Sequence, residues 1–322
     1  MWRGFFCFDP RFMKCSLAFL VMSTQVLYAG LERYSPLVVA DVSPAAPGGD
    51  EVRVTYLGTN GFQFESGNHA LLVDPYFSRI NLWRVVLGSS VQPDEHRIDD
   101  AMKQLASKVD AILVTHGHVD HLFDAPVLMR RTDARLIGSR TAVELAGRAG
   151  VPASRCHAVT GGDVLRVGPW RIRAFTATHD RLFWIVPFAG EVRRSGLPRR
   201  AADWVCGAPL AYLIEIAGQR IFNDSGGTPA VLPPGDIAPV DLAILGAALP
   251  DSRARFWAAV RRLRPRYVFP SHQDNFFRPL SAGFQFGPLT DFPGLLRAYK
   301  REVPPGHLIL FDYFRPWTLR RE

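Results

Sequence analysis

The sequence predicts an α/β fold in which two β-sheets pack face to face with helices outside them, a four-layer αββα sandwich. Strand-like segments form a meander at the start of the main body, helix-like segments then alternate with strands in each half, and polar residues directly follow several buried strands. With 322 residues, of which 48% are hydrophobic and 21% charged, the chain has the composition of a globular protein that can bury such a core.

The N-terminal segment differs from the rest of the chain. Arg3, Arg11 and Lys14 precede a mostly apolar run over 17–27, an order typical of an export signal. We therefore interpret residues 1–30 as a signal peptide that directs the protein to the periplasm or outside the cell. The alternatives are a membrane anchor and a cytoplasmic tail. Residues 31–50 are predicted to be a linker and residues 51–322 a single folded domain, because 41–50 is rich in Pro and Gly.

The predicted strands of the first half are short and bounded by turn residues, except for the run that precedes His116. That run is almost entirely apolar, which indicates a strand buried on both faces. The predicted strands of the first half cover 52–57, 62–65, 70–73, 109–115, 135–138, 163–167 and 170–177, and those of the second half cover 209–216, 220–223, 241–245, 266–270 and 307–311.

Helices are predicted where apolar residues recur every three or four positions. The helix after Ser139 shows the clearest boundaries, because Ser139 suits an N-cap and Gly150 suits a C-terminal end. The predicted helices cover 98–108, 121–131, 139–150, 251–263 and 295–301.

The net charge of the chain constrains its binding partners only loosely. The formal net charge of +8 favours anionic partners such as phosphate esters or lipid headgroups, although it also serves solubility.

Four cysteines are too few for a disulfide scaffold. Cys156 and Cys206, the two that lie outside the N-terminal segment, are either free thiols or one bridge.

The strongest functional signal is a cluster of metal-binding residue types. His116, His118, Asp120 and His121 lie within six residues, immediately after the buried strand. The chain has only 9 histidines, and three of them are in this segment. Imidazole and carboxylate groups at this density suit zinc and related divalent ions, with two ligands on a loop and two at the start of a helix.

Three further candidate ligands, His179, Asp224 and His272, lie at or just after the ends of predicted strands. Any one of them alone is more typical of a structural residue. Their shared position at strand ends, where α/β proteins place functional groups, favours a common site.

The whole pattern resembles the metallo-β-lactamase superfamily, whose signature is His-x-His-x-Asp-His followed by a distant His, Asp and His. The resemblance covers residue 51 to the C-terminus. It implies that the first metal ion is held by His116, His118 and His179, that the second is held by Asp120, His121 and His272, and that Asp224 bridges both. Asp74 matches the family's first motif, an aspartate that supports the site from behind the ligands.

Particular residues indicate which members of the superfamily the chain resembles most. Asp224 stands where antibiotic-hydrolysing members commonly have cysteine, and His118 stands where di-iron oxygen-reducing members have glutamate. The segments 223–227 and 272–277 look most like the branch that contains ascorbate-phosphate lactonases and N-acylphosphatidylethanolamine phospholipase D. That branch often carries Gly-His after its first strand, where this chain has Gly58-Thr59-Asn60.

The resemblance implies a hydrolase with two divalent metal ions, for which we expect zinc, with manganese and iron as alternatives. A metal-bridging hydroxide is the expected nucleophile, and Asp120 is the expected catalytic residue that orients it or accepts its proton. The expected substrate is a phosphodiester, such as a phospholipid-like molecule. An ester or lactone hydrolase is the first alternative, and an iron-dependent redox enzyme of the same fold is the second.

Aromatic and basic residues follow two of the candidate ligands. Aromatic side chains and a proline after His179 and His272 either line an apolar substrate pocket or pack in the core, and core packing is the favoured interpretation; they are Phe183, Trp184, Pro187, Phe188, Phe276 and Phe277. Arg193, Arg194, Arg199 and Arg200 either contact a phosphate or lipid surface or are solvated. The expected partner is thus a small or lipid-like substrate, anionic in the first instance. Membrane-surface association is left open, as is the oligomeric state, and no nucleic acid is expected.

Overall fold

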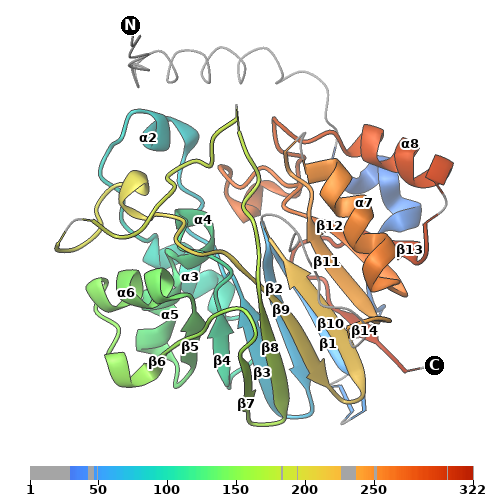
Figure 1. Ribbon diagram of the computed structural model, residues 1–322, viewed down its shortest axis with the longest axis horizontal. Helices are drawn as coiled ribbons and strands as arrows, with labels where there is room; N and C mark the ends of the chain where they lie inside the picture. Colours follow the sequence, from blue (N-terminus) through green and yellow to red (C-terminus); the bar gives the residue numbers. More distant parts are fainter. Residues whose placement is uncertain are drawn as a thin grey trace, which may run out of the picture.

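The structure is a computed structural model, and it describes residues 30–42, 47–48, 50–182, 184–193, 195–225, 237–249, 252–302 and 304–321. Two mixed β-sheets lie at the centre of the molecule, with helices on both outer sides (Figure 1). This arrangement confirms the predicted αββα sandwich. The predicted signal peptide lies almost entirely outside the described residues, so the division of the chain into signal, linker and domain stays a prediction.

The first sheet contains seven strands, in the order β14 (Trp317–Leu319), β1 (Val52–Gly58), β2 (Gly61–Ser66), β3 (His69–Val73), β4 (Ala111–Leu113), β5 (Arg135–Gly138) and β6 (Cys156–Ala158). The second sheet also contains seven, in the order β13 (His307–Leu308), β12 (Tyr267–Ser271), β11 (Leu242–Gly246), β10 (Gln219–Asp224), β9 (Leu210–Ile216), β8 (Trp170–Thr176) and β7 (Val164–Val167).

The helices fall into two groups by the sheet that they cover (Figure 1). On the side of the first sheet lie α2 (Leu82–Val86), α3 (Glu95–Met102), α4 (Val119–Leu122), α5 (Ala125–Arg131) and α6 (Arg140–Arg148). On the side of the second sheet lie α7 (Ser252–Leu263) and α8 (Phe292–Glu302). Short 3₁₀ turns are η1 (Leu31–Leu37), η2 (Ala153–Arg155), η3 (Ala201–Asp203) and η4 (Leu280–Ala282).

Strand β4 and its neighbour β3 show how side-chain alternation builds the layers. Leu71 and Val73 belong to the core between the sheets, whereas Leu72 belongs to the core under the outer helices. Leu113 and Ile112 divide in the same way between these two cores. Because successive side chains of a strand point to opposite faces, a strand covered on both sides must be apolar throughout. This confirms the prediction that the strand preceding His116 is buried on both faces.

The carboxyl ends of five strands meet at one edge of the sandwich. In the first sheet, β3 and β4 are parallel. In the second sheet, β10, β11 and β12 are parallel to one another, and β8 runs in the same direction because β9 is antiparallel to both β8 and β10. The residues that follow β3, β4, β8, β10 and β12 are therefore delivered to the same place, as the sequence analysis required of the candidate ligands.

Several local features differ from the sequence-based expectation. The first part of the expected linker packs against the core, because Leu31 is buried and Val38 forms a β-bridge with Leu310. The helix predicted over 121–131 is divided into α4 and α5, since Pro126 in the first turn of α5 has no backbone N–H to continue the first helix. Strands β6 and β14 and helix α2 were not predicted; they are only 3 to 5 residues long. Within the described residues, no helix is long and apolar enough to cross a membrane.

Candidate metal centre

The seven predicted ligands come from the strand ends described above. His116 lies in the loop after β4, His118 is the N-cap of α4, and Asp120 and His121 are in its single turn. His179 follows β8, Asp224 is the last residue of β10, and His272 directly follows β12. All seven are buried or half-buried. The structure thus brings together residues that are up to 156 positions apart, from His116 to His272.

Three histidines form the first group. Ligand atoms of His116, His118 and His179 all lie within 4.8 Å of one another. The Nε2 atom of His116 is 2.9 Å from the Nδ1 atom of His118. The His179 ring packs against both, with centroid distances of 4.8 Å to His116 and 4.7 Å to His118. Three imidazoles that converge on one point are a common zinc-binding arrangement.

Asp120, His121 and His272 form the second group, whose ligand atoms also lie within 4.8 Å of one another. The Oδ2 atom of Asp120 is 3.1 Å from His272 Nε2 and 3.3 Å from His121 Nε2. The two groups are adjacent, since the ring centroids of His116 and His121 are 4.0 Å apart. Asp224, 1% exposed, belongs to neither group, and its bridging role stays a prediction.

The outer ring nitrogens of three histidines are bound by other groups. His116 Nδ1 lies 3.1 Å from the Thr115 hydroxyl, and His121 Nδ1 lies 2.9 Å from the Asp74 carboxylate. His179 Nδ1 donates to the carbonyl of Asp180 at 2.7 Å. Such contacts fix the ring orientation and leave each Nε2 available as a ligand. The Asp180 carboxylate in turn pairs with Arg255 of α7. Asp180, to which the sequence analysis assigned no role, thereby connects His179 to that helix.

Asp74 is the centre of the hydrogen-bond network behind the ligands. Its fully buried carboxylate accepts from the backbone N–H of Thr115 at 2.8 Å, from the Thr115 hydroxyl and from the Asn60 amide at 2.9 Å, and it faces His121. Its backbone φ is +41°, in the left-handed region that non-glycine residues rarely adopt. Strained backbone of this kind concentrates at functional sites, and His272 with φ +62° is a second example.

Asn60 has a role that sequence reasoning missed. Its amide nitrogen also lies 2.9 Å from Asn223 Oδ1, and its amide oxygen accepts from the Ser271 hydroxyl at 2.7 Å. A single buried side chain thus joins the loop after β1 to the ends of β10 and β12. The residue directly after Gly58, where the resembled branch often has histidine, is Thr59, so that departure did not single out Asn60.

A second buried network supports the segment after His272. The carboxylate of Asp274 accepts from Arg79 at 2.7 Å, from Tyr313 at 2.7 Å and from Tyr56 at 2.9 Å. Arg79 and Asp274 are both almost completely buried. Burial tends to raise the pKa of the Asp274 carboxyl, but Arg79 and Tyr313 hold it below its ordinary value. Because this ion pair is fixed by neutral donors as well, it anchors the turn that carries His272.

The histidines of the two ligand groups differ in their pKa values, and therefore in their charge at neutral pH. Burial and the neighbouring histidines lower the pKa of His118 to about 3 and that of His179 to about 4. Burial also tends to lower the pKa of His121, but the carboxylates of Asp120 and Asp74 raise it to about 10. The first group is thus neutral at pH 7, as a metal ligand must be, whereas the second carries a proton that a metal ion would displace.

The donor set fits divalent cations. Neutral imidazoles that converge in one group, and a carboxylate with two imidazoles in the other, are the ligand types that zinc and neighbouring transition metals take. The outer ring nitrogens of His116, His121 and His179 are held by the Thr115 hydroxyl, a carboxylate and a carbonyl, as in established metal sites.

The apolar residues near the centre are less buried than expected. Trp184 is 90% exposed and Phe188 37% exposed, so core packing was the wrong interpretation for both. Phe188 nevertheless lies 6.3 Å from the ring of His118, and Phe276 lies 4.9 Å from His272. Phe183 and Arg194 lie outside the described residues.

Of the two alternatives for Cys156 and Cys206, free thiols or one disulfide bridge, the structure shows free thiols.

Comparison with known proteins agrees with this architecture. The model of the β-lactamase superfamily domain matches residues 53–272. A protein of Myxococcus xanthus named metal-dependent hydrolase is 27% identical over 252 residues, which cover 76% of this chain and 78% of the relative. Igni18, described as a novel metallo hydrolase from Ignicoccus hospitalis, has a TM-score of 0.57 and 19% identity and covers 84% of this chain and 100% of its own. CmlA, a diiron β-hydroxylase from Streptomyces venezuelae, has a TM-score of 0.53 and 16% identity over 87% of this chain and 55% of its own.

The fold and the site together define a metal-dependent hydrolase of the metallo-β-lactamase fold. The chain belongs to the β-lactamase superfamily domain family, whose model covers more than half of its length.

Proposed function

We propose that this protein is a dinuclear zinc hydrolase that cleaves an amphiphilic phosphodiester. The observation that carries the proposal is the contact between two ligand groups, in which the rings of His116 and His121 are 4.0 Å apart. Two metal sites so close together are typical of enzymes in which both ions act on one substrate. When bound, two such ions would lower the pKa of a shared water and polarise a phosphoryl or carbonyl oxygen.

The protein side chains then have distinct roles in the proposal. His116, His118 and His179 would hold one ion, Asp120, His121 and His272 would hold the other, and Asp224 would bridge them. Asp120 is the catalytic residue, because its Oδ2 atom lies within the second group, 3.1 Å from His272 Nε2 and 3.3 Å from His121 Nε2, where a carboxylate would orient the attacking water or accept its proton. Asp74 and Asn60 keep the ligands in place.

Support for an amphiphilic substrate comes from exposed apolar residues on two stretches of chain, one of which follows the candidate ligand His179. Trp184, Ile185 and Phe188 are exposed on the segment that follows His179, Trp83 is exposed on α2, and Leu87 is exposed directly after α2. A β-bridge between Ser90 and Arg200 ties the end of that segment to the chain just after α2. Exposed apolar residues beside basic ones are typical of surfaces that meet lipid-like molecules. We therefore also propose an exported or membrane-associated protein.

The test is a hydrolysis assay on the full-length protein loaded with zinc. Bis(p-nitrophenyl) phosphate, a p-nitrophenyl ester and a simple lactone are compared before and after treatment with a chelator. Chelator-sensitive turnover of the phosphodiester supports the proposal. Turnover of the ester or lactone alone replaces it with the lactonase alternative, which the same metal centre is able to serve. Iron in the protein as purified, before zinc loading, together with oxygen consumption and no hydrolysis, contradicts both.

A further inference from the structure

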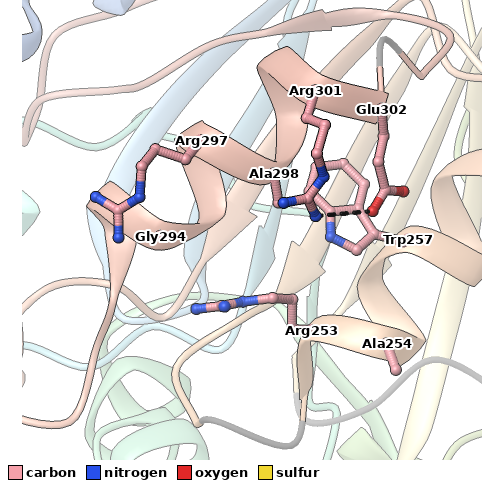
Figure 2. Close-up of a pocket in the computed structure, with 8 residues that line it drawn as sticks. All are labelled: Arg253, Ala254, Trp257, Gly294, Arg297, Ala298, Arg301 and Glu302. Atoms are coloured by element: carbon pink, nitrogen blue, oxygen red, sulfur yellow. Dashed lines mark ion pairs between the residues drawn. The ribbon is translucent and has the colours of Figure 1, made fainter.

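A groove of about 510 Å³ lies between α7 and α8, on the outer side of the second sheet and apart from the candidate ligands (Figure 2). Small residues, Ala254, Gly294 and Ala298, leave the space open, and the indole of Trp257 lines it. None of the residues that line this groove is a candidate metal ligand.

The walls of the groove are strongly basic. Arg253 comes from α7, and Arg297 and Arg301 come from α8, while Glu302 is the one carboxylate among the lining residues. Arg253 pairs with Asp291 at 2.6 Å, and Arg301 lies 3.6 Å from Glu302. Among the residues that the structure describes, Arg297 has no ion-pair partner. Arg253 and Arg301 thus each have a carboxylate partner, and among the described lining residues Arg297 carries the positive charge that no ion pair offsets.

Trp257 provides an independent indication of a ligand. The residue is only 4% exposed, and its indole Nε1 is buried with no hydrogen-bond partner among the described residues. A buried donor without an acceptor costs about 1–3 kcal/mol. Figure 2 shows the nitrogen edge of the indole turned toward the space between Arg301 and Arg253. An oxygen ligand bound there would accept the unused hydrogen bond.

We propose that this groove binds a small, multiply charged oxyanion of the phosphate class, such as a soluble phosphate monoester or diphosphate. Guanidinium groups and an indole N–H are all donors, and planar guanidinium groups recognise phosphate oxygens through paired hydrogen bonds. The anion neutralises the arginines and joins α7 to α8. This site is separate from the metal centre and does not depend on the proposed hydrolysis.

The experiment is isothermal titration of the full-length protein with inorganic pyrophosphate, with and without prior removal of metal by dialysis against chelator. We expect one saturable site that survives metal removal. Arg297→Ala is expected to weaken binding about tenfold or more, and Trp257→Phe, which removes the N–H donor together with part of the ring, about fivefold. The matched control is Arg140→Ala on α6, which removes an exposed arginine of the same charge and is expected to leave binding unchanged.

Four results would overturn the proposal, the last of them in the vesicle experiment. The first is the absence of saturable binding. The second is equal weakening by Arg140→Ala and Arg297→Ala, which indicates attraction to net charge alone. The third is loss of binding after metal removal, with no effect of the groove variants, which places pyrophosphate at the metal centre. Vesicles of phosphatidylcholine and phosphatidic acid separate the sources of the phosphate group. If they bind through Arg297 while free pyrophosphate does not, the ligand is a lipid headgroup and the soluble-ligand assignment is wrong.

Discussion

At the scale of single residues, the metal centre depends on the protonation state of each histidine before metal arrives. His118 and His179 have pKa values of about 3 and 4 because they are buried beside other imidazoles. His121, with a pKa of about 10, keeps its proton because Asp120 and Asp74 oppose the effect of burial. The two halves of the centre are therefore expected to load differently as the pH changes.

The first prediction concerns this loading. Between pH 6 and 8 the first group is already neutral, so its zinc affinity is expected to change little. The second group must lose the proton of His121, whose raised pKa lies above this range, so its affinity should increase about tenfold per pH unit as the pH rises. Zinc titrations of the metal-free protein at pH 6, 7 and 8, in buffers of different ionisation enthalpy, measure both effects. Equal pH dependence at the two sites would contradict the assignment of the charges.

Gly58 gives a second prediction at the same scale. Its φ of +90° favours glycine, and a Cβ at this position would collide with the guanidinium of the buried Arg79. Gly58→Ala is therefore expected to lower the free energy of unfolding by about 3 kcal/mol. Urea denaturation measures the change. Gly67→Ala is the control, because Gly67 also has positive φ but its Cβ would meet no atom within 4 Å. If the two variants lose the same stability, backbone strain alone explains the effect and the contact with Arg79 does not.

At the scale of elements, the turn between β3 and α2 is fixed to α5 by one side chain. Asp124, at the start of α5, accepts from the backbone N–H of Phe77 at 2.6 Å, from the N–H of Ser78 at 2.7 Å and from the Ser78 hydroxyl. Burial raises the pKa of Asp124 to about 6, although these donors oppose the shift. The contact joins the segment that follows Asp74 to the helices that follow the His-x-His-x-Asp-His motif.

Removal of this contact is the third prediction. Asp124→Ala leaves three buried donors without an acceptor and is expected to lower the free energy of unfolding by about 3 kcal/mol. It is also expected to lower zinc affinity, because Asp74 and the motif are no longer held together. Asp133→Ala, in the exposed turn after α5, is the comparison. Chemical denaturation with and without zinc measures both effects, and unchanged stability would show that the hydrogen bonds contribute little.

The elements also show what could be predicted from the sequence. The apolar run before His116 specified β4 because both of its faces are covered, and Ser139 accepts from the backbone N–H of Ala142 as an N-cap should. The short edge strands β6 and β14 are 3 residues each, too few for a side-chain period to be visible. The division between α4 and α5 follows from Pro126, whose missing backbone N–H apolar spacing does not report.

The candidate site was predictable to the extent that residue type and strand end coincide. His116, His118, Asp120 and His121 are adjacent in the sequence, and the family signature related them to the distant positions. The roles of Asn60 and Asp274 were not predictable, because each joins segments more than 150 residues apart through buried hydrogen bonds. Such contacts depend on the packing of the two sheets, which a single sequence does not contain.

At the scale of the whole molecule, exposed apolar side chains lie on and just after α2 and on the segment that follows His179, and we call these two stretches the rim. Trp83, Leu87, Trp184 and Ile185 are among the few large apolar residues that the described parts of the protein expose. If this rim meets lipid, the full-length protein should sediment with vesicles that contain anionic phospholipid. Trp184→Ala is expected to reduce the bound fraction severalfold, whereas Val164→Ala, at a 51% exposed position on β7, should not. Equal binding by both variants would remove the basis for an amphiphilic substrate.

The most direct test of the account is the metal content of the full-length protein, measured by elemental analysis after zinc loading and removal of excess metal. We predict about two zinc ions per chain for the native sequence and about one for His118→Ala, because the second group keeps its three ligands. His96→Ala, on α3 and outside both groups, should retain two. A native protein that holds no more than one zinc ion, or a His118→Ala variant that still holds two, would contradict the dinuclear centre.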